Sequence, residues 1–153
     1  MKLPKRPMYV LAIFSLIVIL TGVAQAKTES INVEPGKEFT RTIDLAAGDR
    51  TSIIFTVLGP APSKLHFYMV LPNGTTSDYE EVSQCATAFS TSSKGTCQLH
   101  FNNSASSDSQ LLTLDYSVEH YIFGVPQMIF ILGAIAVLLM FAVSGYIIMG
   151  KYG

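Results

Sequence analysis

The residues with the clearest chemical potential in this sequence are two cysteines and three histidines. A cysteine pair can form a disulfide, act as a redox couple, or supply half of a metal site. Histidines supply acid–base groups or metal ligands. Cys85 and Cys97 lie twelve positions apart, which is not the spacing of a C-x-x-C motif. A metal site would need two further ligands at suitable positions. The histidines are His66, His100 and His120.

The three histidines are not predicted to form a metal site. His66 and His100 fall on the outward faces of alternating segments, and His120 follows Glu119 next to a long apolar stretch. A three-histidine site requires the rings to converge, and the pattern gives no sign that they do. We therefore expect surface histidines, no metal and no cofactor.

The remaining candidates for chemistry are acidic or hydroxylic. Asp78, Glu80 and Glu81 surround Tyr79, but their spacing matches no EF-hand loop, and we expect them in a solvated loop. The sequence has no Gly-x-Ser-x-Gly elbow, no Ser-x-x-Lys signature and no phosphate-binding glycine loop. The sequence therefore predicts a protein that is not an enzyme.

The N-terminal end reads as a targeting segment. Lys2, Lys5 and Arg6 precede an apolar run over residues 8–23, and Ala24-Gln25-Ala26 has the small-x-small form of a signal-peptidase site. The run would span about 24 Å as a helix, which is shorter than the ~30 Å hydrocarbon core of a bilayer. Residues 1–26 are therefore predicted to be a signal peptide cleaved after Ala26, with a retained signal-anchor helix as the alternative.

The C-terminal end reads as a membrane span. Residues 125–149 contain no charge and are long enough to cross a bilayer. Tyrosines flank the run and Lys151 follows it, as expected where a helix ends in the cytoplasm. We predict a transmembrane helix over residues 128–149, a junction over 121–127 and a cytoplasmic tail over 150–153. The chain would then be single-pass, with residues 27–120 extracytoplasmic, or two-pass if the N-terminal helix is retained.

The external segment has the pattern of an all-β domain. Apolar and polar residues alternate repeatedly, which is typical of half-buried antiparallel strands. Turn sequences separate these segments, at residues 35–36, 48–49, 59–62, 72–74 and 94–95. We predict an antiparallel β-sandwich whose inward positions are Ile53, Phe55, Val57, Leu65, Phe67, Met69, Leu71, Cys97, Leu99, Phe101, Leu112, Leu114, Tyr116 and Val118.

The location of the two cysteines favours a disulfide. An even pair outside the membrane lies where disulfides persist. A Cys85–Cys97 bridge would contribute about 3 kcal/mol in the chain-entropy model. Two further modifications are predicted from Asn73-Gly74-Thr75 and Asn102-Asn103-Ser104, which are N-glycosylation sequons at Asn73 and Asn102.

Part of the external segment resembles a known family. "GTCQLHFNNSASSDSQLLTLDYSV" is similar to the closing half of a GOLD (Golgi dynamics, emp24-type) domain at Gly95, Cys97, Phe101, Asn103 and Tyr116. "VEPGKEFTRTIDLAAGDRTSIIFTV" and "LHFYMVLPNG" resemble its earlier strands. The resemblance covers residues 31–119 and implies a sandwich used for protein contacts. The chain departs from the cargo adaptors of that family because it has no heptad-bearing helix before Val125 and no coat-binding motif in the tail "KYG".

Two functions fit these features. The first is a non-catalytic accessory subunit of a membrane protein complex, whose helix packs against partner helices. The second is a membrane-tethered interaction module or GOLD-type cargo adaptor. A seam of small and flexible residues at helical spacing would serve the first function: Gly133, Ala136, Met140 and Ser144. Predicted partners are membrane proteins and the lipid bilayer. Nucleic acid is not predicted, because the net charge is −1 and no long basic run exists.

Overall fold

The structure is a computed structural model that describes residues 26–151. The predictions for residues 1–25 and for the last two residues lie outside the described residues. The chain divides into two compact units, one ending at Gly124 and one containing the C-terminal helix. Each unit is described by itself.

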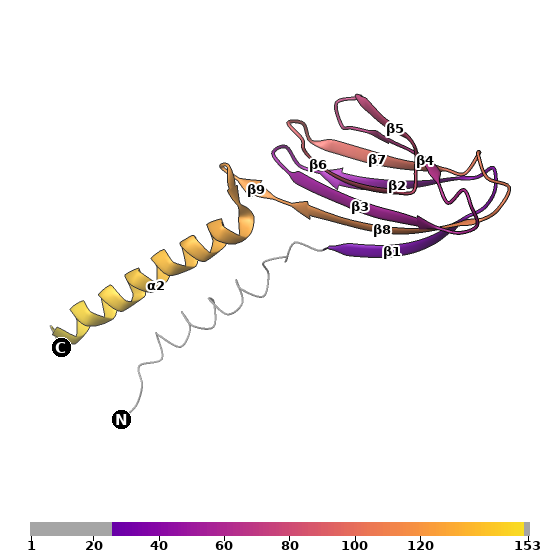
Figure 1. Cartoon of the computed structure of the whole chain (residues 1–153). Coiled ribbons are helices and arrows are strands. Elements are labelled where there is room, and N and C mark those ends of the chain that lie inside the picture. Colours follow the sequence, from indigo (N-terminus) through magenta and orange to yellow (C-terminus); the bar gives the residue numbers. More distant parts are fainter. Residues whose placement is uncertain (1–25, 152–153) are drawn as a thin grey trace. The chain divides into compact units, whose positions relative to one another are not determined.

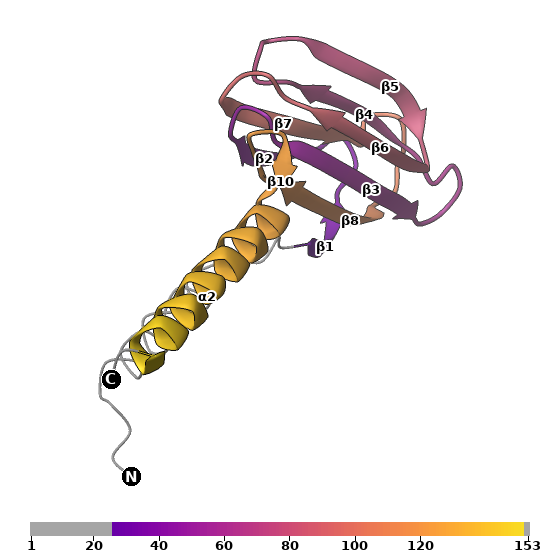
Figure 2. The ribbon, with the colours of Figure 1, turned by 90° about the vertical axis from the view of Figure 1, so that its left-hand side faces the viewer.

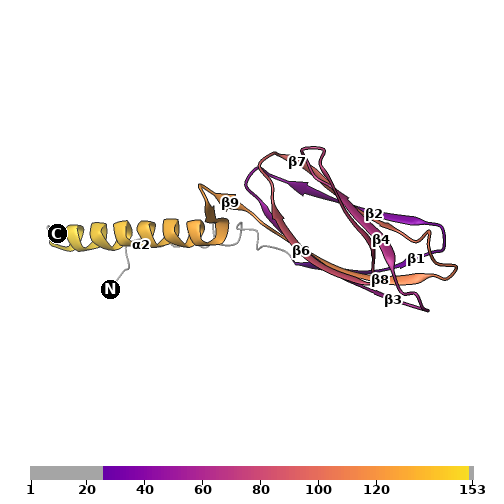
Figure 3. The same ribbon diagram turned by 45° about the horizontal axis from the view of Figure 1, so that its top comes forward.

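The first unit is built from two four-stranded antiparallel sheets that pack face to face (Figures 1 and 3). Sheet A has the strand order β1-β8-β3-β6, and sheet B has the order β2-β7-β4-β5. The predicted antiparallel β fold is therefore confirmed. The strands are β1 (Lys27–Val33), β2 (Glu38–Leu45), β3 (Arg50–Leu58), β4 (Leu65–Val70), β5 (Thr76–Val82), β6 (Gln84–Ser90), β7 (Gly95–Asn102) and β8 (Gln110–Glu119), followed by the two-residue strands β9 (Tyr121–Ile122) and β10 (Val125–Pro126).

The alternation in the sequence sets which side chains enter the core. Successive residues of a strand point to opposite faces of its sheet. The strands β3, β4, β7 and β8 follow this rule, because their buried residues recur at every second position. The predicted inward positions are buried, except Leu71, Tyr116 and Val118, which are partly buried against the same core.

Three phenylalanines occupy the middle of this core. Phe55 of sheet A meets Phe67 and Phe101 of sheet B edge to face, with ring centroids 4.8 Å and 5.0 Å away. Phe67 and Phe101 are neighbours across the β4–β7 pair and stack at 4.9 Å. Such aromatic contacts contribute about 0.5–1.5 kcal/mol each beyond the area they bury. The aromatic cluster therefore connects the two sheets.

An inward-facing arginine connects the sheets near their β1 and β2 edges. Arg41 of β2 donates to the Tyr116 hydroxyl of β8 at 2.7 Å and lies 2.8 Å from a carboxylate oxygen of Glu29 on β1. A charge that points inward at a sheet edge discourages the edge from pairing with another chain. Arg41 therefore contributes both to cross-sheet contact and to protection of the open edge.

The cysteines do not form the predicted disulfide. Both are free thiols, Cys97 fully buried on β7 and Cys85 partly buried on β6. Only Ser83 separates β6 from β5, whereas β7 lies two strands away from β5 in sheet B. Cys97 is therefore separated from Cys85 by the ~10 Å between the sheets and, in the perpendicular direction, by about two strand spacings of ~4.8 Å each. A disulfide needs Cα atoms within about 7 Å. The prediction of a Cys85–Cys97 bridge is therefore wrong, although the inward position of Cys97 is confirmed.

The acidic stretch is also placed differently from the prediction. Asp78, Glu80 and Glu81 lie on β5, an edge strand, and not in a loop (Figure 2). A register irregularity occurs between His66 and Tyr68 on the neighbouring β4, and Glu80 has a left-handed backbone with φ of 59°. These are the features of a β-bulge, which lets successive side chains leave the regular alternation. Glu80 and Glu81 are accordingly both exposed.

The second unit contains the helix α2 (Gln127–Lys151). Its segment Gln127–Gly145 is long and apolar enough to cross a membrane, and none of it is buried within the described chain. The helix begins one residue before the predicted span over 128–149 and continues two residues beyond it. It has no polar face, because apolar side chains are exposed around its whole circumference, among them Met128, Ile129, Leu132, Leu138 and Phe141.

Candidate functional site

The densest polar contacts lie on the outer surface of sheet B. We call this surface the B face and define it by the outward side chains of Glu38, Thr40, His66, Tyr68, Asp78, His100 and Asn102. Strand pairing places Asn102 between Glu38 and His66 in one row, and His100 between Thr40 and Tyr68 in the next. Asp78 extends the second row through its pairing with Tyr68. His66 and His100 are therefore outward, as their alternation predicted, and the strand pairing brings both to one face.

Tyr68 and His100 form the aromatic centre of the B face. Their rings stack in parallel, with centroids 4.4 Å apart and an interplanar angle of 5°. The ring of His66 lies on the same strand as Tyr68, 5.6 Å from it. Only 14% of the His100 side chain is exposed, so this histidine is more buried than the surface position we predicted. The stack holds the Tyr68 ring in a fixed orientation on the sheet.

Glu38 connects three strands on this face. Its carboxylate accepts hydrogen bonds from Nδ1 of His100 and from Nδ2 of Asn102, and the Tyr68 hydroxyl lies 3.4 Å away. The hydrogen bond from His100 is the main reason that the pKa of Glu38 lies below its ordinary value. Burial and the charge of Glu38 raise the pKa of Tyr68, so its hydroxyl stays protonated at neutral pH.

Asp78 is held in the same way at the β5 edge. It accepts from the Glu80 backbone N–H and from Nε2 of His66, both at 2.9 Å. These two bonds, the backbone bond first, lower the pKa of Asp78. A carboxyl whose pKa is lowered by folding stabilises the fold above its unfolded pKa and loses that contribution as the pH falls through the lowered value. The B face therefore keeps both carboxylates ionised to a lower pH than unperturbed glutamate and aspartate side chains would be.

His120 belongs to a different part of the sandwich. Its Nδ1 donates to Asp49, a buried carboxylate in the β2–β3 turn, at 2.9 Å. The other oxygen of Asp49 accepts from the Ala46 backbone N–H at 2.8 Å. A carboxylate–imidazole pair is also the orienting half of a nucleophilic triad. Within residues 26–151, however, no hydroxyl or thiol bonds to Nε2 of His120, so the pair fastens the end of β8 to this turn.

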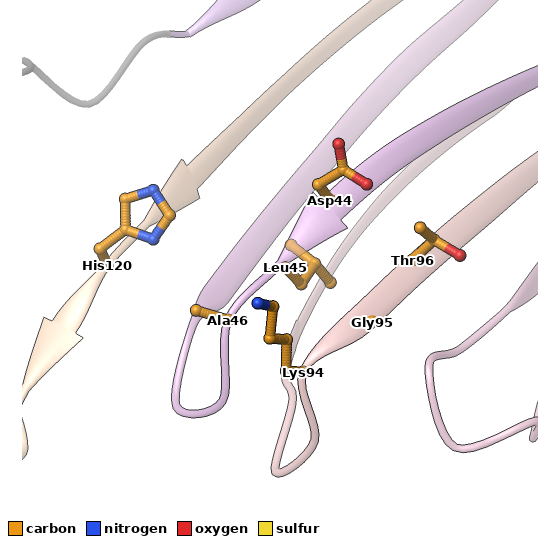
Figure 4. Close-up of a pocket in the computed structure, with 7 residues that line it drawn as sticks. All are labelled: Asp44, Leu45, Ala46, Lys94, Gly95, Thr96 and His120. Carbon is orange, nitrogen blue, oxygen red and sulfur yellow. The ribbon is translucent and has the colours of Figure 1, made fainter.

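His120 also lines a hollow of ≈ 440 Å³, and Figure 4 shows the side chains that surround this hollow. Its lining is formed by Asp44, Leu45, Ala46, Lys94, Gly95, Thr96 and His120. Most of the exposed surface that lines the hollow comes from apolar atoms. Lys94 makes no ion pair within the described part of the chain. A second hollow of ≈ 400 Å³ lies on the outer surface of sheet A, between Arg50 and Glu119. Among the described residues, no serine or threonine hydroxyl that lines either hollow is hydrogen-bonded to the histidine or carboxylate that lines it.

Metal-ligating side chains do not gather in the described residues. Within residues 26–151 no group of three or more histidine, cysteine, aspartate or glutamate side chains is placed to hold a metal ion. The buried Cys97 thiol is also a poor ligand, since burial raises its pKa to about 11 and ligation requires the thiolate.

The thiol state of the cysteines can be tested directly. Because both are free, iodoacetamide should alkylate both in denaturant without a reductant. In the native protein at pH 8 Cys97 should stay unlabelled, because it is buried and a pKa of about 11 leaves about one thiolate in a thousand. Cys85, which is partly exposed, should label first. Mass spectrometry of the labelled chain measures the adducts. Labelling in denaturant that requires prior reduction would show a disulfide instead.

The two sequons occupy different environments. Asn73 is exposed in the β4–β5 turn, where its side-chain oxygen accepts from the Thr75 backbone N–H. Asn102 is partly buried, donates to Glu38, and has a buried Oδ1 atom. Glycosylation stays a prediction for both, and the folded domain offers an exposed carboxamide at Asn73.

The predicted helix seam lies on one side of α2. Gly133, Ala136, Met140 and Ser144 are all exposed in the described chain. A Cβ atom placed on Gly133 would meet no atom within 4 Å. The Ser144 hydroxyl donates to the Met140 carbonyl at 2.7 Å, so its polar group is satisfied within the helix. Packing of the seam against another helix stays a prediction.

Comparison with known proteins gives likenesses of fold only. No protein-family model and no curated protein matches the chain. Among solved structures, it is similar to Aeromonas hydrophila PliG, a periplasmic lysozyme inhibitor of g-type lysozyme, with 12% identity over 63% of this chain and 88% of that chain and a TM-score of 0.46. It is also similar to the Yersinia pseudotuberculosis-derived mitogen YPM, with 10% identity over 65% and 91% and a TM-score of 0.40.

A third likeness involves a much larger protein. The GH115 4-O-methyl-α-glucuronidase BtGH115A shares 13% identity over 61% of this chain and 14% of that chain, with a TM-score of 0.36. At these identities and scores no function is carried over from any of the three. The resemblance to the GOLD domain stays a prediction from the sequence.

Proposed function

We propose that this chain is a non-catalytic accessory subunit of a membrane protein complex, anchored by α2 and acting through its sandwich outside the cytoplasm. The observation that carries the proposal is the helix. Its segment Gln127–Gly145 is apolar on every side and unburied within the described residues. A helix without a polar face suits the hydrocarbon interior, whereas a helix lying on a membrane surface needs a polar side.

The non-catalytic part of the proposal rests on the sandwich. The Asp49–His120 pair serves no nucleophile within the described residues, and the Cys97 thiol is buried and protonated. The orientation rests on the sequence, in which Lys151 follows the span. Only residues 120–126 connect β8 to α2. The length of this connection limits how far the sandwich can extend from the membrane.

Membrane insertion and orientation are tested by extraction and protease protection. We expect the chain to remain in membranes after an alkaline carbonate wash. In sealed vesicles with the external side outward, protease should digest the sandwich and spare α2. Release of the intact chain by carbonate would contradict the proposal, and protection of the sandwich would contradict its orientation.

Assembly is tested on the seam of α2. Leucine at Gly133 and Ala136 would place bulk on the predicted contact, and within the described residues a Cβ added at Gly133 meets no atom within 4 Å. We expect the double substitution Gly133→Leu with Ala136→Leu to shift the detergent-extracted chain from a stoichiometric complex toward the free subunit on a native gel. Ala142→Leu, on the opposite side of α2, is the matched control and should leave the complex intact. A complex that is unchanged by both variants would reject the seam.

The alternative function is a membrane-tethered interaction module, including a cargo adaptor of GOLD type. The B face favours this alternative, because its ordered carboxylates and aromatic stack lie on an outer sheet surface. If the module acts through its sandwich alone, Tyr68→Ala should reduce partner recovery while the seam variants preserve it. The opposite result supports the subunit.

A further inference from the structure

We propose that the B face, with the acidic edge of β5 beside it, is a docking surface for a lysine- and arginine-rich segment of a protein partner. This inference rests on the proposed function, since it names the chemistry of the partner that the anchored sandwich would bind. The argument comes from charge, from the absence of lysine and arginine at the outward positions of the four strands, and from the ordered aromatic stack.

Negative charge is concentrated on the outer side of sheet B. Five carboxylates lie at exposed positions of its strands: Glu38, Asp44, Asp78, Glu80 and Glu81. The only lysine or arginine in the four strands is Arg41, which faces inward and pairs with Glu29. Asp44, Glu80 and Glu81 make no ion pair within residues 26–151. Since the whole chain carries a net charge of only −1, this concentration is a local feature and not a consequence of composition.

The outer surface of sheet A provides the contrast. Its outward positions on β3, β6 and β8 are mostly serine, threonine, alanine and aliphatic residues. Their only charged residues are Arg50, Asp115 and Glu119, and Arg50 pairs with Glu119 across β3 and β8 in the strand register. The two faces therefore have different electrostatic character. A cationic partner would be attracted to sheet B and not to sheet A.

The centre of the B face is ordered for contact with a cation. Tyr68 stacks on His100, while His66 and His100 hold Asp78 and Glu38 through hydrogen bonds. Glu38 remains 33% exposed and Asp78 54% exposed, so both carboxylates still have open sides. A guanidinium can lie over an aromatic ring and bond a neighbouring carboxylate at the same time. Little ordering of the face would then be needed on binding.

Other occupants fit less well. An anionic lipid surface or a nucleic acid would be repelled by the five carboxylates. A bound metal ion requires converging ligands, and the described residues contain no such group. A flexible or extended basic segment of a protein matches both the charge and the breadth of a four-stranded sheet.

The test uses the full chain in nanodiscs of zwitterionic lipid, so that the lipid adds no net charge. The probe is a fluorescein-labelled peptide of alternating arginine and serine, and binding is measured by fluorescence anisotropy at low salt. We expect Asp78→Asn with Glu81→Gln to weaken binding about 10-fold. Asp115→Asn with Glu119→Gln removes the same charge from sheet A and should change affinity less than about 2-fold.

Two further variants separate docking from unfolding. Glu80→Gln with Glu81→Gln alters side chains that make no hydrogen bond within the sandwich. This double variant should therefore fold normally and still bind the peptide more weakly. Tyr68→Ala should lower the affinity for the peptide about 3-fold, and Tyr68→Phe should leave the affinity unchanged, because the ring and not the hydroxyl contacts the cation. A peptide carrying glutamate in place of arginine should not bind.

Three results would overturn the inference: no binding of the arginine peptide to the unmodified chain, equal weakening by the sheet A and sheet B variants, or equal binding of the glutamate peptide. None of these depends on the membrane experiments. A chain that resists carbonate and keeps its complex but fails to bind the peptide refutes the docking surface alone. Release by carbonate refutes the proposed function whatever the peptide does.

Discussion

We expect Leu112→Ala to lower the free energy of unfolding of the sandwich by about 3 to 4 kcal/mol. Leu112 is fully buried on β8, the strand that pairs with both β1 and β3 in sheet A. Its neighbours across the sheet are Ile31 and Val57. Truncation would remove apolar contacts and leave a cavity that surrounding strands on both sides prevent from closing.

The matched control is the adjacent leucine. Leu111 precedes Leu112 on the same strand but points outward and is 42% exposed. Leu111→Ala should therefore cost less than about 1 kcal/mol. Urea unfolding followed by tyrosine fluorescence is suitable, because the chain contains no tryptophan. A larger loss at Leu111 than at Leu112 would mean that β8 is shifted by one residue, since a one-residue slip exchanges the two faces.

The same alternation explains what the sequence predicts well. A strand with one buried face has a two-residue period that is visible in a short window, as in Ile53, Phe55 and Val57. Turns with glycine are also local: Gly48 and Gly74 have φ of 91° and 82°, which side chains rarely adopt. The inward positions and most turns of the sandwich were therefore predictable from the residues alone.

The strands β5 and β6 were harder to predict. "TSDYEEV" is rich in acidic residues that are uncommon in strands, and β5 forms because it pairs with β4 at a sheet edge. Only Ser83 separates it from β6 in the other sheet. The sequence does not reveal this passage of the chain from sheet B to sheet A. The disulfide prediction was wrong for the same reason, because Cys85 lies on an edge strand of sheet A and Cys97 on an inner strand of sheet B.

The contacts of the B face depend on long-range pairing. The outward direction of His66 and His100 follows from local alternation, and the structure confirms it. Their partners do not follow from it, because Glu38 is 62 positions from His100 in the chain. Asp49 was seen in the sequence as part of a turn, yet its burial and its bond to His120 arise from a contact over 71 positions. No local pattern encodes such a register.

Asn103 is the second position at which we expect a large loss of stability. Its side-chain amide is buried and donates to the carbonyls of Val33 and Asp108, both at 2.9 Å. Its backbone N–H and carbonyl also bond to Lys37 and Gly36. These bonds fasten the end of β7 to the β1–β2 turn and to the loop before β8. Asn103→Ala would leave two carbonyls without donors, and we expect a loss of about 2 to 4 kcal/mol.

Two variants identify the amide as the cause. Asn102→Ala, one residue earlier, removes a single hydrogen bond of 3.3 Å on the B face and should cost less than about 1 kcal/mol. Asn103→Asp keeps the shape but replaces the donor with an oxygen that faces two carbonyls. Burial beside these oxygens would raise the pKa of that carboxyl in the folded state above its unfolded value of about 3.9.

The sign of the resulting pH dependence is therefore fixed. A carboxyl with a raised folded pKa can remain protonated and donate at low pH, and its contribution is lost as the pH rises through the folded pKa. Asn103→Asp should accordingly be most stable near pH 4 and lose stability toward pH 7, whereas Asn103→Ala should show the pH dependence of the unmodified chain. Urea midpoints measured across that range distinguish the two. If the Asp variant were as stable at pH 7 as at pH 4, the amide would not be acting as a donor to the two carbonyls.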